Sequence, residues 1–252
     1  MKMIIVAAGQ GTRLKPYTNN VPKCMVKFKQ KPIIDYILET ATSCKIDKIA
    51  IIGGYKIEIL KNYLKDTNIS FFNNKNYETT NMVHSLFCSK KFMDDDLIIS
   101  YSDIIYKKSI LKKLISSDYD FSVVIDKEWR KLWELRMENP LEDAETLKIS
   151  NNNIIEIGKK PNTYDDIQGQ YIGLFKISKK IVNQIIKYYF SLDKNSHYDE
   201  KNFDNMYMTS FIQLVLDNLL NVKPIFIDGG WIEIDSINDL KILEGVDENF
   251  NI

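Results

Sequence analysis

The sequence predicts an α/β fold: a mixed, mainly parallel sheet covered by helices on both faces. Two observations lead to this prediction. Short apolar runs alternate with amphipathic segments over most of the chain, an order that favours parallel strands joined by right-handed crossovers. The 252 residues also suit one α/β domain of generous size. We therefore expect residues 1–252 to form a single domain, with a smaller β-rich insertion at about 127–170.

The first half of the chain shows the alternation most clearly. Residues 3–8 form a short apolar run that is typical of a buried parallel strand. Pro32 can begin a helix because its fixed φ suits the first turn, and Ile33, Ile37 and Ala41 then recur on one face. The other elements expected before the insertion are strands at 48–52, 69–72, 97–101 and 121–125 and helices at 57–64 and 80–91.

The insertion at 127–170 interrupts this alternation. It is rich in charge and ends in Gly169-Gln170, so we expect it to form one side of a ligand cleft. Near the end of the chain, Ser236 can cap a closing helix, with Asp239 near the positive end of the helix dipole. The elements expected between these segments are strands at 171–177 and 222–227, helices at 181–190 and 209–220, and a polar loop at 193–205.

The composition excludes several classes of partner. Lys plus Arg and Asp plus Glu each number 34, so the net charge is zero and no basic field attracts nucleic acid. The three cysteines show no CxxC spacing, and the two histidines form no zinc-site pattern with them. The first apolar run is too short for a signal peptide, and no stretch is long enough to span a membrane. We therefore expect a cytoplasmic protein that binds neither nucleic acid nor membrane.

The most informative motif follows the first apolar run. Gly9-Gln10-Gly11-Thr12 is a loop of small residues, and Arg13, Lys15 and Lys23 follow it closely. Small residues let backbone N–H groups approach a phosphate chain, and the cations offset its charge. The motif therefore predicts a triphosphate site. The residues expected to contact the nucleotide there are Ala7, Ala8, Gly9, Gly11, Thr12, Arg13 and Lys23.

Two better-known phosphate-binding loops are excluded by the same residues. A Walker A loop needs Gly-Lys-Ser/Thr after a four-residue gap, which this chain does not contain. A dinucleotide-binding loop needs a third glycine where Leu14 stands. Pro16 would also fall in the first turns of the helix that both motifs require. A glycine-rich turn that binds nothing would leave the three cations unexplained.

Asp103 and Asp235 are the best pair of carboxylates for a metal site. Each follows an apolar segment where a strand should end, and open α/β sheets place their ligand sites at strand ends. Mg²⁺ prefers oxygen ligands from one or two carboxylates together with phosphates and water. The alternative is that each aspartate only caps a turn. The acidic run at 94–96 precedes a strand, so we interpret it as a solvated turn.

Asn81 and Ser85 are further candidates for nucleotide binding. They lie four residues apart, hence on one face of the predicted helix, and could contact the base or the ribose. A capping or core-facing role fits the same spacing nearly as well. His84 lies beside them, but a lone histidine in an amphipathic helix is more often structural than catalytic.

The signature at 7–16, followed by Pro22-Lys23, resembles that of the nucleoside-triphosphate transferases, which activate sugar phosphates and phosphocholine. The short length and the Asn-x-x-x-Ser-Leu and Glu-Ile-Asp-Ser segments resemble the cytidylyltransferase branch, which includes phosphocholine and phosphoglutamine cytidylyltransferases. The resemblance implies a Rossmann-like fold, CTP as the nucleotide, Mg²⁺ as the cofactor and a CDP-linked product. It covers nearly the whole chain, because it continues through 81–86, 102–106, 158–161, 169–173 and 231–235.

The resemblance also implies roles for individual residues. Asp103 and Asp235 match the two metal-binding aspartates of the family. Lys23 matches the lysine that reaches the phosphates during transfer, and we expect Arg13 to act in catalysis beside it. Lys160 resembles a lysine that contacts the acceptor phosphate, but the residue before it is not the usual glutamate, which leaves its role open.

The insertion is expected to bind the phosphorylated acceptor. Its tryptophans and acids could hold a cation, or else the tryptophans belong to the core and the acids face solvent. Arg130, Lys131 and Arg136 lie among them and could meet the carboxylate of an amino acid. We therefore favour L-glutamine phosphate narrowly over phosphocholine, with 2-aminoethylphosphonate third, and the resemblance implies a role in decorating bacterial surface polysaccharides. The expected acceptor contacts are Trp129, Arg130, Glu145, Lys160, Tyr171 and Gly173.

Three other functions compete with this interpretation. A sugar-1-phosphate nucleotidyltransferase would use UTP or dTTP with a similar fold. A glycosyltransferase commonly carries Asp-x-Asp at the metal strand, whereas this chain has Asp103-Ile104-Ile105. A non-catalytic nucleotide sensor should have lost Lys23 or a metal aspartate, and this chain keeps them all. Whether the protein is a monomer or a homodimer stays open.

Overall fold

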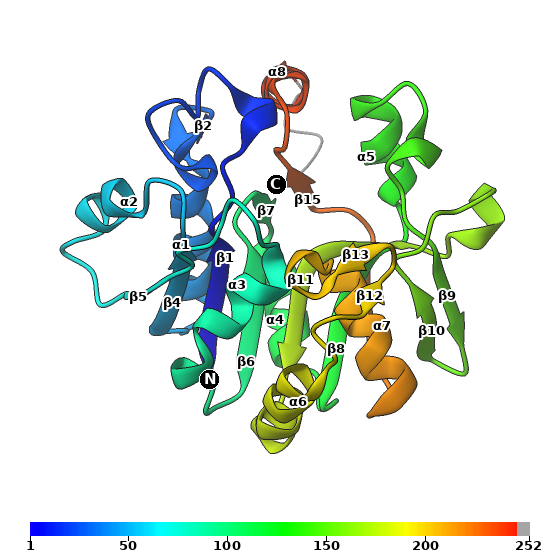
Figure 1. Cartoon of the computed structure of the whole chain (residues 1–252). Helices are drawn as coiled ribbons and strands as arrows, with labels where there is room; N and C mark the ends of the chain where they lie inside the picture. The colour runs from blue at the N-terminus through cyan, green and yellow to red at the C-terminus, as the bar shows by residue number, and fades with distance from the viewer. Residues whose placement is uncertain (246–252) are drawn as a thin grey trace.

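A seven-stranded sheet forms the centre of the molecule in the computed structural model, which describes residues 1–245 (Figure 1). The one strand that runs antiparallel to its neighbours is β11, so the sheet is mixed and mainly parallel, as predicted. In spatial order the strands are β14 (Lys223–Ile227), β8 (Phe121–Asp126), β11 (Gln170–Ile177), β6 (Leu97–Tyr101), β1 (Lys2–Ala7), β4 (Lys48–Gly53) and β5 (Ser70–Asn73).

Helices cover both faces of this sheet. Alternate residues of β1 point to opposite faces, and both sets are buried, so the strand reads as a continuous apolar run. The face with Met3 and Ile5 packs against α1 (Ile33–Ser43), α2 (Ile57–Tyr63) and α4 (Lys108–Ile115). The face with Ile4 and Val6 packs against α3 (Met82–Cys88), α6 (Lys179–Ser191) and α7 (Met208–Asn218).

Most elements lie within a few residues of their predicted positions. The main exceptions are α4, which the sequence did not reveal, and α3, which is shorter than the helix predicted at 80–91. Ser89 ends α3 because its N–H and hydroxyl both bond the carbonyl of Leu86, and a 3₁₀ turn (Lys90–Phe92) follows. None of the helices within residues 1–245 is both long enough and apolar enough to cross a bilayer.

The insertion contains the expected strands and also a helix. β9 (Leu147–Ser150) and β10 (Asn153–Ile157) form a hairpin, but α5 (Trp129–Arg136) precedes it. Residues 129, 132, 133 and 136 are the buried ones, which is the spacing of one helix face. The prediction considered the tryptophans and the charges of this segment but not their helical period.

Two strands outside the main sheet bring distant parts of the chain together. β7 (Ile104–Tyr106) pairs antiparallel with β15 (Trp231–Glu233), so the residues that flank this pair become neighbours. The N–H of Ile234 donates to the carbonyl of Asp103 at 2.9 Å. The closing helix α8 (Ile237–Gly245) starts directly after this pair, and Ser236 caps it as predicted, since its hydroxyl accepts from the N–H of Asp239 at 3.1 Å. The remaining short pairs are β2 (Lys27–Phe28) with β3 (Lys31–Pro32) and β12 (His197–Tyr198) with β13 (Lys201–Asn202), the latter within the predicted polar loop.

Candidate active site

The glycine-rich loop after β1 folds tightly against Lys23. Gly11 has a φ of +61°, and a Cβ added there would lie 2.9 Å from the Cβ of Lys23, so only glycine fits without displacement. The hydroxyl of Thr18 donates to the carbonyl of Gly11 at 2.9 Å and holds the loop from the other side. The loop leads into a single 3₁₀ turn (Thr12–Leu14) instead of an α-helix, which suits the position of Pro16.

This loop forms one wall of a cavity of about 430 Å³. The cavity opens at the carboxyl ends of β1 and β6, where α/β sheets place their ligand sites. Ala7 lies buried at the end of β1, behind the cavity wall, and the exposed Lys15 is not one of the residues found to line it. The other predicted nucleotide residues do line it: Ala8, Gly9, Gly11, Thr12, Arg13, Lys23, Asn81, Ser85 and Asp103, together with Val6, Tyr77, Thr80, Met82, Ser102 and Asp235.

Asn81 and Ser85 line this cavity and also hold α3 in place. The side-chain oxygen of Asn81 accepts from the N–H of Met82 at 2.8 Å, which is a helix cap. The hydroxyl of Ser85 accepts from the amide of Asn74 at 2.9 Å and donates to the carbonyl of Asn81 at 3.2 Å. The capping alternative is thus realised for Asn81, and base contact stays a prediction for both residues.

A cluster of charges lines the cavity. Nζ of Lys23 lies 2.5 Å from Oδ2 of Asp103 and 2.5 Å from Oδ1 of Asp235. The guanidinium of Arg13 forms an ion pair with the other carboxylate oxygen of Asp235. The structure thus brings together the four residues assigned to catalysis, and the pairing of β7 with β15 is what places Asp103 beside Asp235. Burial acts to lower the pKa of Lys23, but the charges of Asp103 and Asp235 outweigh it and hold the pKa above its ordinary value, so the ammonium stays charged.

The two aspartates fit a magnesium ion. Oδ1 of Asp103 is buried and has no hydrogen-bond partner among residues 1–245, although a buried carboxylate oxygen ordinarily has one. Within residues 1–245, no group of three or more His, Cys, Asp and Glu side chains is arranged to hold a metal. A closed structural site therefore does not fit the described residues. A pair of carboxylates that leaves positions for phosphate oxygens and water does fit Mg²⁺.

A second, smaller cavity of about 180 Å³ adjoins the first, and Met82 lines both. Its lining combines carboxylates with aromatic rings, and within the described chain none of the residues found to line it is Lys or Arg. Gly173, with a φ of +82°, lets β11 approach the ring of Tyr101, because a Cβ there would lie 2.6 Å from that ring. The lining residues are Met82, Tyr101, Trp133, Asp143, Glu145, Gln170, Tyr171, Ile172, Gly173, Tyr207, Met208, Thr209, Trp231 and Glu233.

Glu145 is held firmly in this second cavity. Its N–H donates to the side-chain oxygen of Gln170 at 3.1 Å, and its carbonyl accepts from the amide of the same glutamine. Its carboxylate accepts from the hydroxyl of Thr209 at 3.2 Å. Burial raises the pKa of Glu145 to about 7, and burial also raises that of Glu233 to about 7 even though the Arg136 guanidinium opposes the shift. The hydroxyl of Tyr171 is buried beside that of Tyr101 and makes no well-formed hydrogen bond within the described residues, so it can donate to a ligand.

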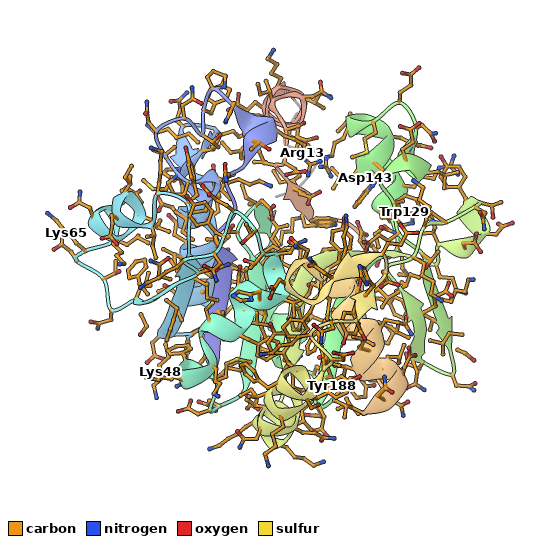
Figure 2. All side chains as sticks on the ribbon, in the orientation of Figure 1. Arg13, Lys48, Lys65, Trp129, Asp143 and Tyr188 are labelled. Carbon is orange, nitrogen blue, oxygen red and sulfur yellow. The ribbon has the colours of Figure 1, made fainter. Side chains whose placement is uncertain are left out.

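Three of the predicted acceptor residues do not reach this cavity. Trp129 is buried in the core against Trp133, with ring centroids 5.6 Å apart. Arg130 is half exposed, pairs with Glu134 at 2.6 Å and lies over a tyrosine ring. Lys160 donates to two backbone carbonyls of the insertion, at 3.1 and 2.8 Å. In Figure 2, Trp129 and Asp143 lie on the α5 side of the molecule and Arg13 lies across from them.

The basic residues considered for the acceptor carboxylate are also occupied elsewhere. Lys131 is exposed and pairs with Glu128 at 2.8 Å. Arg136 is buried and forms ion pairs with Glu233 and Asp239. The positions of these basic residues therefore do not support the prediction that they bind the carboxylate of a zwitterionic acceptor. The helical spacing of α5 directs their side chains to the surface or into the core.

Some lining residues were missed although the sequence carried a signal for them. Trp231 and Glu233 precede Asp235 at intervals of two, so an extended strand presents all three on one face. Tyr207 and Thr209 come from the start of α7, far along the chain from Glu145, and only the tertiary fold reveals them.

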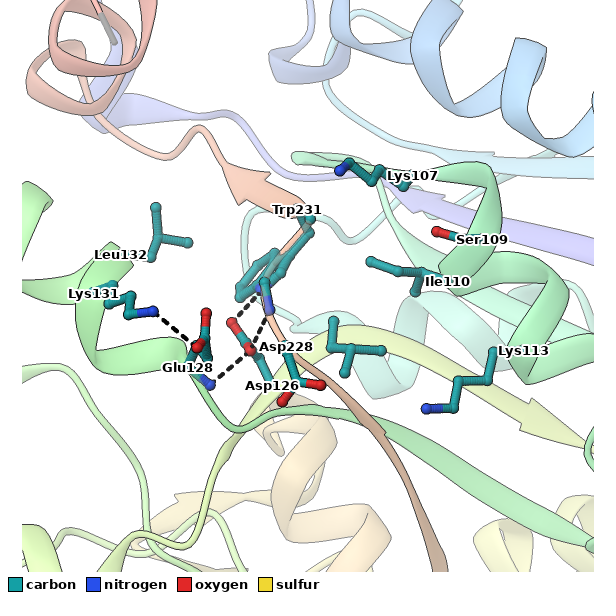
Figure 3. A pocket seen from close by; sticks show the side chains of 13 residues that line it. Lys107, Ser109, Ile110, Lys113, Asp126, Glu128, Lys131, Leu132, Asp228 and Trp231 are labelled. Carbon is teal, nitrogen blue, oxygen red and sulfur yellow. Dashed lines mark hydrogen bonds and ion pairs between the residues drawn. The ribbon is translucent and has the colours of Figure 1, made fainter. Parts of the chain in front are cut away.

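Trp231 is a wall shared by the second cavity and a third one of about 560 Å³ (Figure 3). Its indole N–H donates to Oδ2 of the buried Asp126 at 2.8 Å. Oδ1 of Asp126 accepts from the N–H groups of Glu128 and Gly229, each at 2.9 Å. Asp126 therefore fixes the indole ring from the side of the third cavity, which Figure 3 shows.

Comparisons with known proteins identify relatives of this chain. A family model described as "Nucleotidyl transferase" matches residues 2–210. The chain is 51% identical over 249 residues to the CTP:phosphoglutamine cytidylyltransferase of Campylobacter jejuni subsp. jejuni serotype O:2, covering 96% of this chain and 98% of that protein. It is 30% identical over 260 residues to the choline-phosphate cytidylyltransferase of Streptococcus pneumoniae, covering 100% of both. The solved structure of the inositol-1-phosphate CTP transferase from T. maritima shares the fold, with a TM-score of 0.75 at 22% identity over 98% of this chain and 97% of that one.

Proposed function

This chain belongs to the nucleotidyl transferase family, and on that premise we propose that it is a Mg²⁺-dependent cytidylyltransferase. It joins CTP to a small phosphorylated acceptor and releases pyrophosphate. The observation that carries the proposal is the position of Lys23, between Asp103 and Asp235, in a cavity that adjoins a second, acidic and aromatic one. The first cavity suits the nucleotide and the second suits the acceptor.

The proposed reaction needs charge neutralisation and alignment. An oxygen of the acceptor phosphate attacks the α-phosphorus of CTP, and the bond from that phosphorus to the pyrophosphate oxygen breaks. The attacking phosphate is already ionised, so no general base has to remove a proton. Lys23 and Arg13 supply positive charge to the triphosphate at the loop. A bound Mg²⁺, held by Asp103 and Asp235, would supply further charge stabilisation at the phosphates.

For the acceptor we propose L-glutamine phosphate first and phosphocholine second, with 2-aminoethylphosphonate third. The relative at 51% identity acts on phosphoglutamine by its name, which supports the first choice. The acids Asp143, Glu145 and Glu233 suit a positively charged amino group, and the hydroxyl of Tyr171 can donate to an oxygen of the acceptor. The aromatic walls also suit a quaternary ammonium, which keeps phosphocholine second.

Two further parts of the proposal carry over the expectations from the sequence and from the resemblance to cytidylyltransferases. We propose that the reaction takes place in the cytoplasm and that the CDP-linked product serves to decorate bacterial surface polysaccharides.

The test of the function is pyrophosphate release over a matrix of CTP, UTP, ATP and dTTP against the three acceptors and glucose 1-phosphate. We expect CTP with L-glutamine phosphate to give the highest kcat/KM. A site that hydrogen-bonds the cytosine amino group rejects UTP, because its own polar groups would be left unpaired. Equal use of UTP or dTTP with the sugar phosphate would contradict the proposal. A clear preference for phosphocholine would change the acceptor but not the reaction.

Glu145→Gln is expected to raise the KM for an acceptor with an amino group at least ~10-fold, because a hydrogen bond to a charged group contributes roughly 1.5–3 kcal/mol. The kcat and the KM for CTP should change little. In the wild type, kcat/KM for the acceptor should fall as the pH drops through about 7, since the raised pKa means that Glu145 is protonated below it.

The variant separates this pH effect from the titration of the acceptor phosphate, whose second pKa lies near ~6. Glu145→Gln should lose the part of the pH dependence near 7 and keep the part that belongs to the phosphate. Glu142→Gln, an exposed glutamate of the same segment, is the matched control and should behave like the wild type. An unchanged acceptor KM in Glu145→Gln would remove this residue from the acceptor site.

A further inference from the structure

Arg136 contacts a wall residue of the second cavity and reaches the first cavity only through Asp239, and it is not among the residues found to line either cavity. It is the last residue of α5, and its side chain is 2% exposed. Nη1 donates to Oε2 of Glu233 at 2.8 Å. Nε and Nη2 donate to the two carboxylate oxygens of Asp239, at 2.8 and 3.3 Å. One guanidinium thus joins the insertion to a wall residue of the acceptor cavity and to the first turn of α8.

Asp239 transmits this contact to Asp235. Its Oδ2 accepts from the N–H of Asp235 at 3.0 Å and from the N–H of Ser236 at 2.7 Å. The carboxylate of Asp235 is the one that pairs with Lys23 and Arg13 at the nucleotide cavity. A displacement of Asp239 would therefore displace the backbone that carries Asp235.

We propose that Arg136 is a positioning residue that holds Asp235 in place through Asp239 and holds Glu233 in place directly. The insertion and the metal-binding aspartate are thereby fixed to each other as one unit. This inference rests on the proposed function, because it takes Asp235 as a metal ligand. Residues that orient a metal ligand from outside the coordination sphere typically affect metal affinity or activity ~10–100-fold.

The chemistry of the side chain explains why arginine stands here. A planar guanidinium can bridge two carboxylates with fixed geometry, whereas the ammonium of lysine is a point charge on a flexible stem. If residue 136 carried no positive charge, the carboxylates of Asp239 and Glu233 would lie close together with no counter-ion of their own. This would be costly for Asp239 in particular, because that residue is only 3% exposed. A second contact supports the same link, because the amide of Asn238 donates to the carbonyl of Arg136 at 3.1 Å.

The test compares Arg136→Met and Arg136→Lys with the wild type and with Lys148→Met. Lys148 is a matched control, because it also bridges two carboxylates of this part of the chain, Glu156 and Asp166, but lines neither cavity. Amide hydrogen exchange, Mn²⁺ binding followed by electron paramagnetic resonance, and steady-state kinetics are measured on each full-length variant.

In Arg136→Met we expect the amides of Asp235 and Ser236 to exchange at least ~10-fold faster, while those of β1 and β6 stay unchanged. Mn²⁺ should bind ~10-fold more weakly, and kcat should fall more than the KM for CTP rises. Arg136→Lys should show intermediate values, since it restores the charge but not the planar fork. Lys148→Met should match the wild type in all three measurements.

Wild-type exchange and Mn²⁺ affinity in both Arg136 variants would overturn the inference. If Arg136→Met does not fold, Arg136→Lys alone decides, because a lysine variant that matches the wild type contradicts the need for the guanidinium. A failure of the proposed function would give a different set of results from a failure of this inference. The wild type would then release no pyrophosphate from CTP, while the exchange of the Asp235 and Ser236 amides would still show whether Arg136 holds them.

Discussion

Asp103→Ala is expected to lower kcat at least ~10²-fold while the fold stays intact. Charge stabilisation by a metal contributes several kcal/mol to such transition states, and each ~1.4 kcal/mol corresponds to a tenfold change in rate. The variant removes the buried oxygen that has no hydrogen-bond partner in the described part of the chain, and it also removes one of the two carboxylates that hold Lys23. The measurement is pyrophosphate release at saturating CTP and acceptor over a series of Mg²⁺ concentrations.

The control lies at the opposite end of the same strand. Asp94 precedes β6, is mostly exposed and pairs with Lys2, so Asp94→Asn should keep wild-type turnover. Circular dichroism of both variants checks that the sheet is formed. Near-normal turnover in Asp103→Ala, or full activity of the wild type with excess chelator, would rule out the metal mechanism.

Lys23→Ala is expected to lower kcat by ~10²–10³-fold with a smaller effect on the KM for CTP. Removing one donor aimed at charge that develops in the transition state typically has an effect of this size. The side chain of Lys23 is 12% exposed and lies between two carboxylates, so its charge acts in a site that water screens poorly. The variant also leaves Asp103 and Asp235 close together without the ammonium between them, so Mg²⁺ should raise the melting temperature more in Lys23→Ala than in the wild type.

Arg13→Ala is expected to affect nucleotide binding, in contrast to Lys23→Ala, which is expected to affect the transfer step. The side chain of Arg13 is 66% exposed at the cavity mouth, so we expect it to contribute to nucleotide binding more than to the transfer step. Arg13→Ala should chiefly raise the KM for CTP. An unchanged kcat in Lys23→Ala would show that the lysine does not act on the phosphates during transfer.

The strand end, the loop and the helix cap around the site could be predicted from local patterns, because these patterns depend only on residues that are neighbours in the sequence. β6 occupies the predicted residues 97–101, and Asp103 follows it where the predicted strand end placed a ligand-binding acid. The small residues of the loop after β1 line the first cavity, and Gly11 lets the loop pack closely against Lys23. The capping role of Ser236 also follows from local chemistry.

The acceptor side shows where such patterns stop being informative. Aromatic and charged residues in the insertion were assigned to the ligand by residue type, but the helical period of α5 decides their direction. That period buries Trp129 and Arg136 and leaves Arg130 exposed, whereas Trp133 reaches the cavity. Lys160 was assigned by resemblance, and its contacts with backbone carbonyls of the insertion hold it outside both cavities.

The sequence by itself determined the class of fold, the place of the glycine-rich loop after the first strand and the place of the two aspartates at strand ends, because apolar period, glycine placement and strand ends are local properties of the chain. Only the tertiary structure decided what surrounds those aspartates. The pairing of β7 with β15 brings Asp103 to Asp235, and the packing of α5 on α8 places Arg136 on Asp239. The start of α7 places Thr209 on Glu145 in the same way. These contacts join residues far apart in the chain, and side-chain direction across such an interface depends on packing that no local pattern encodes.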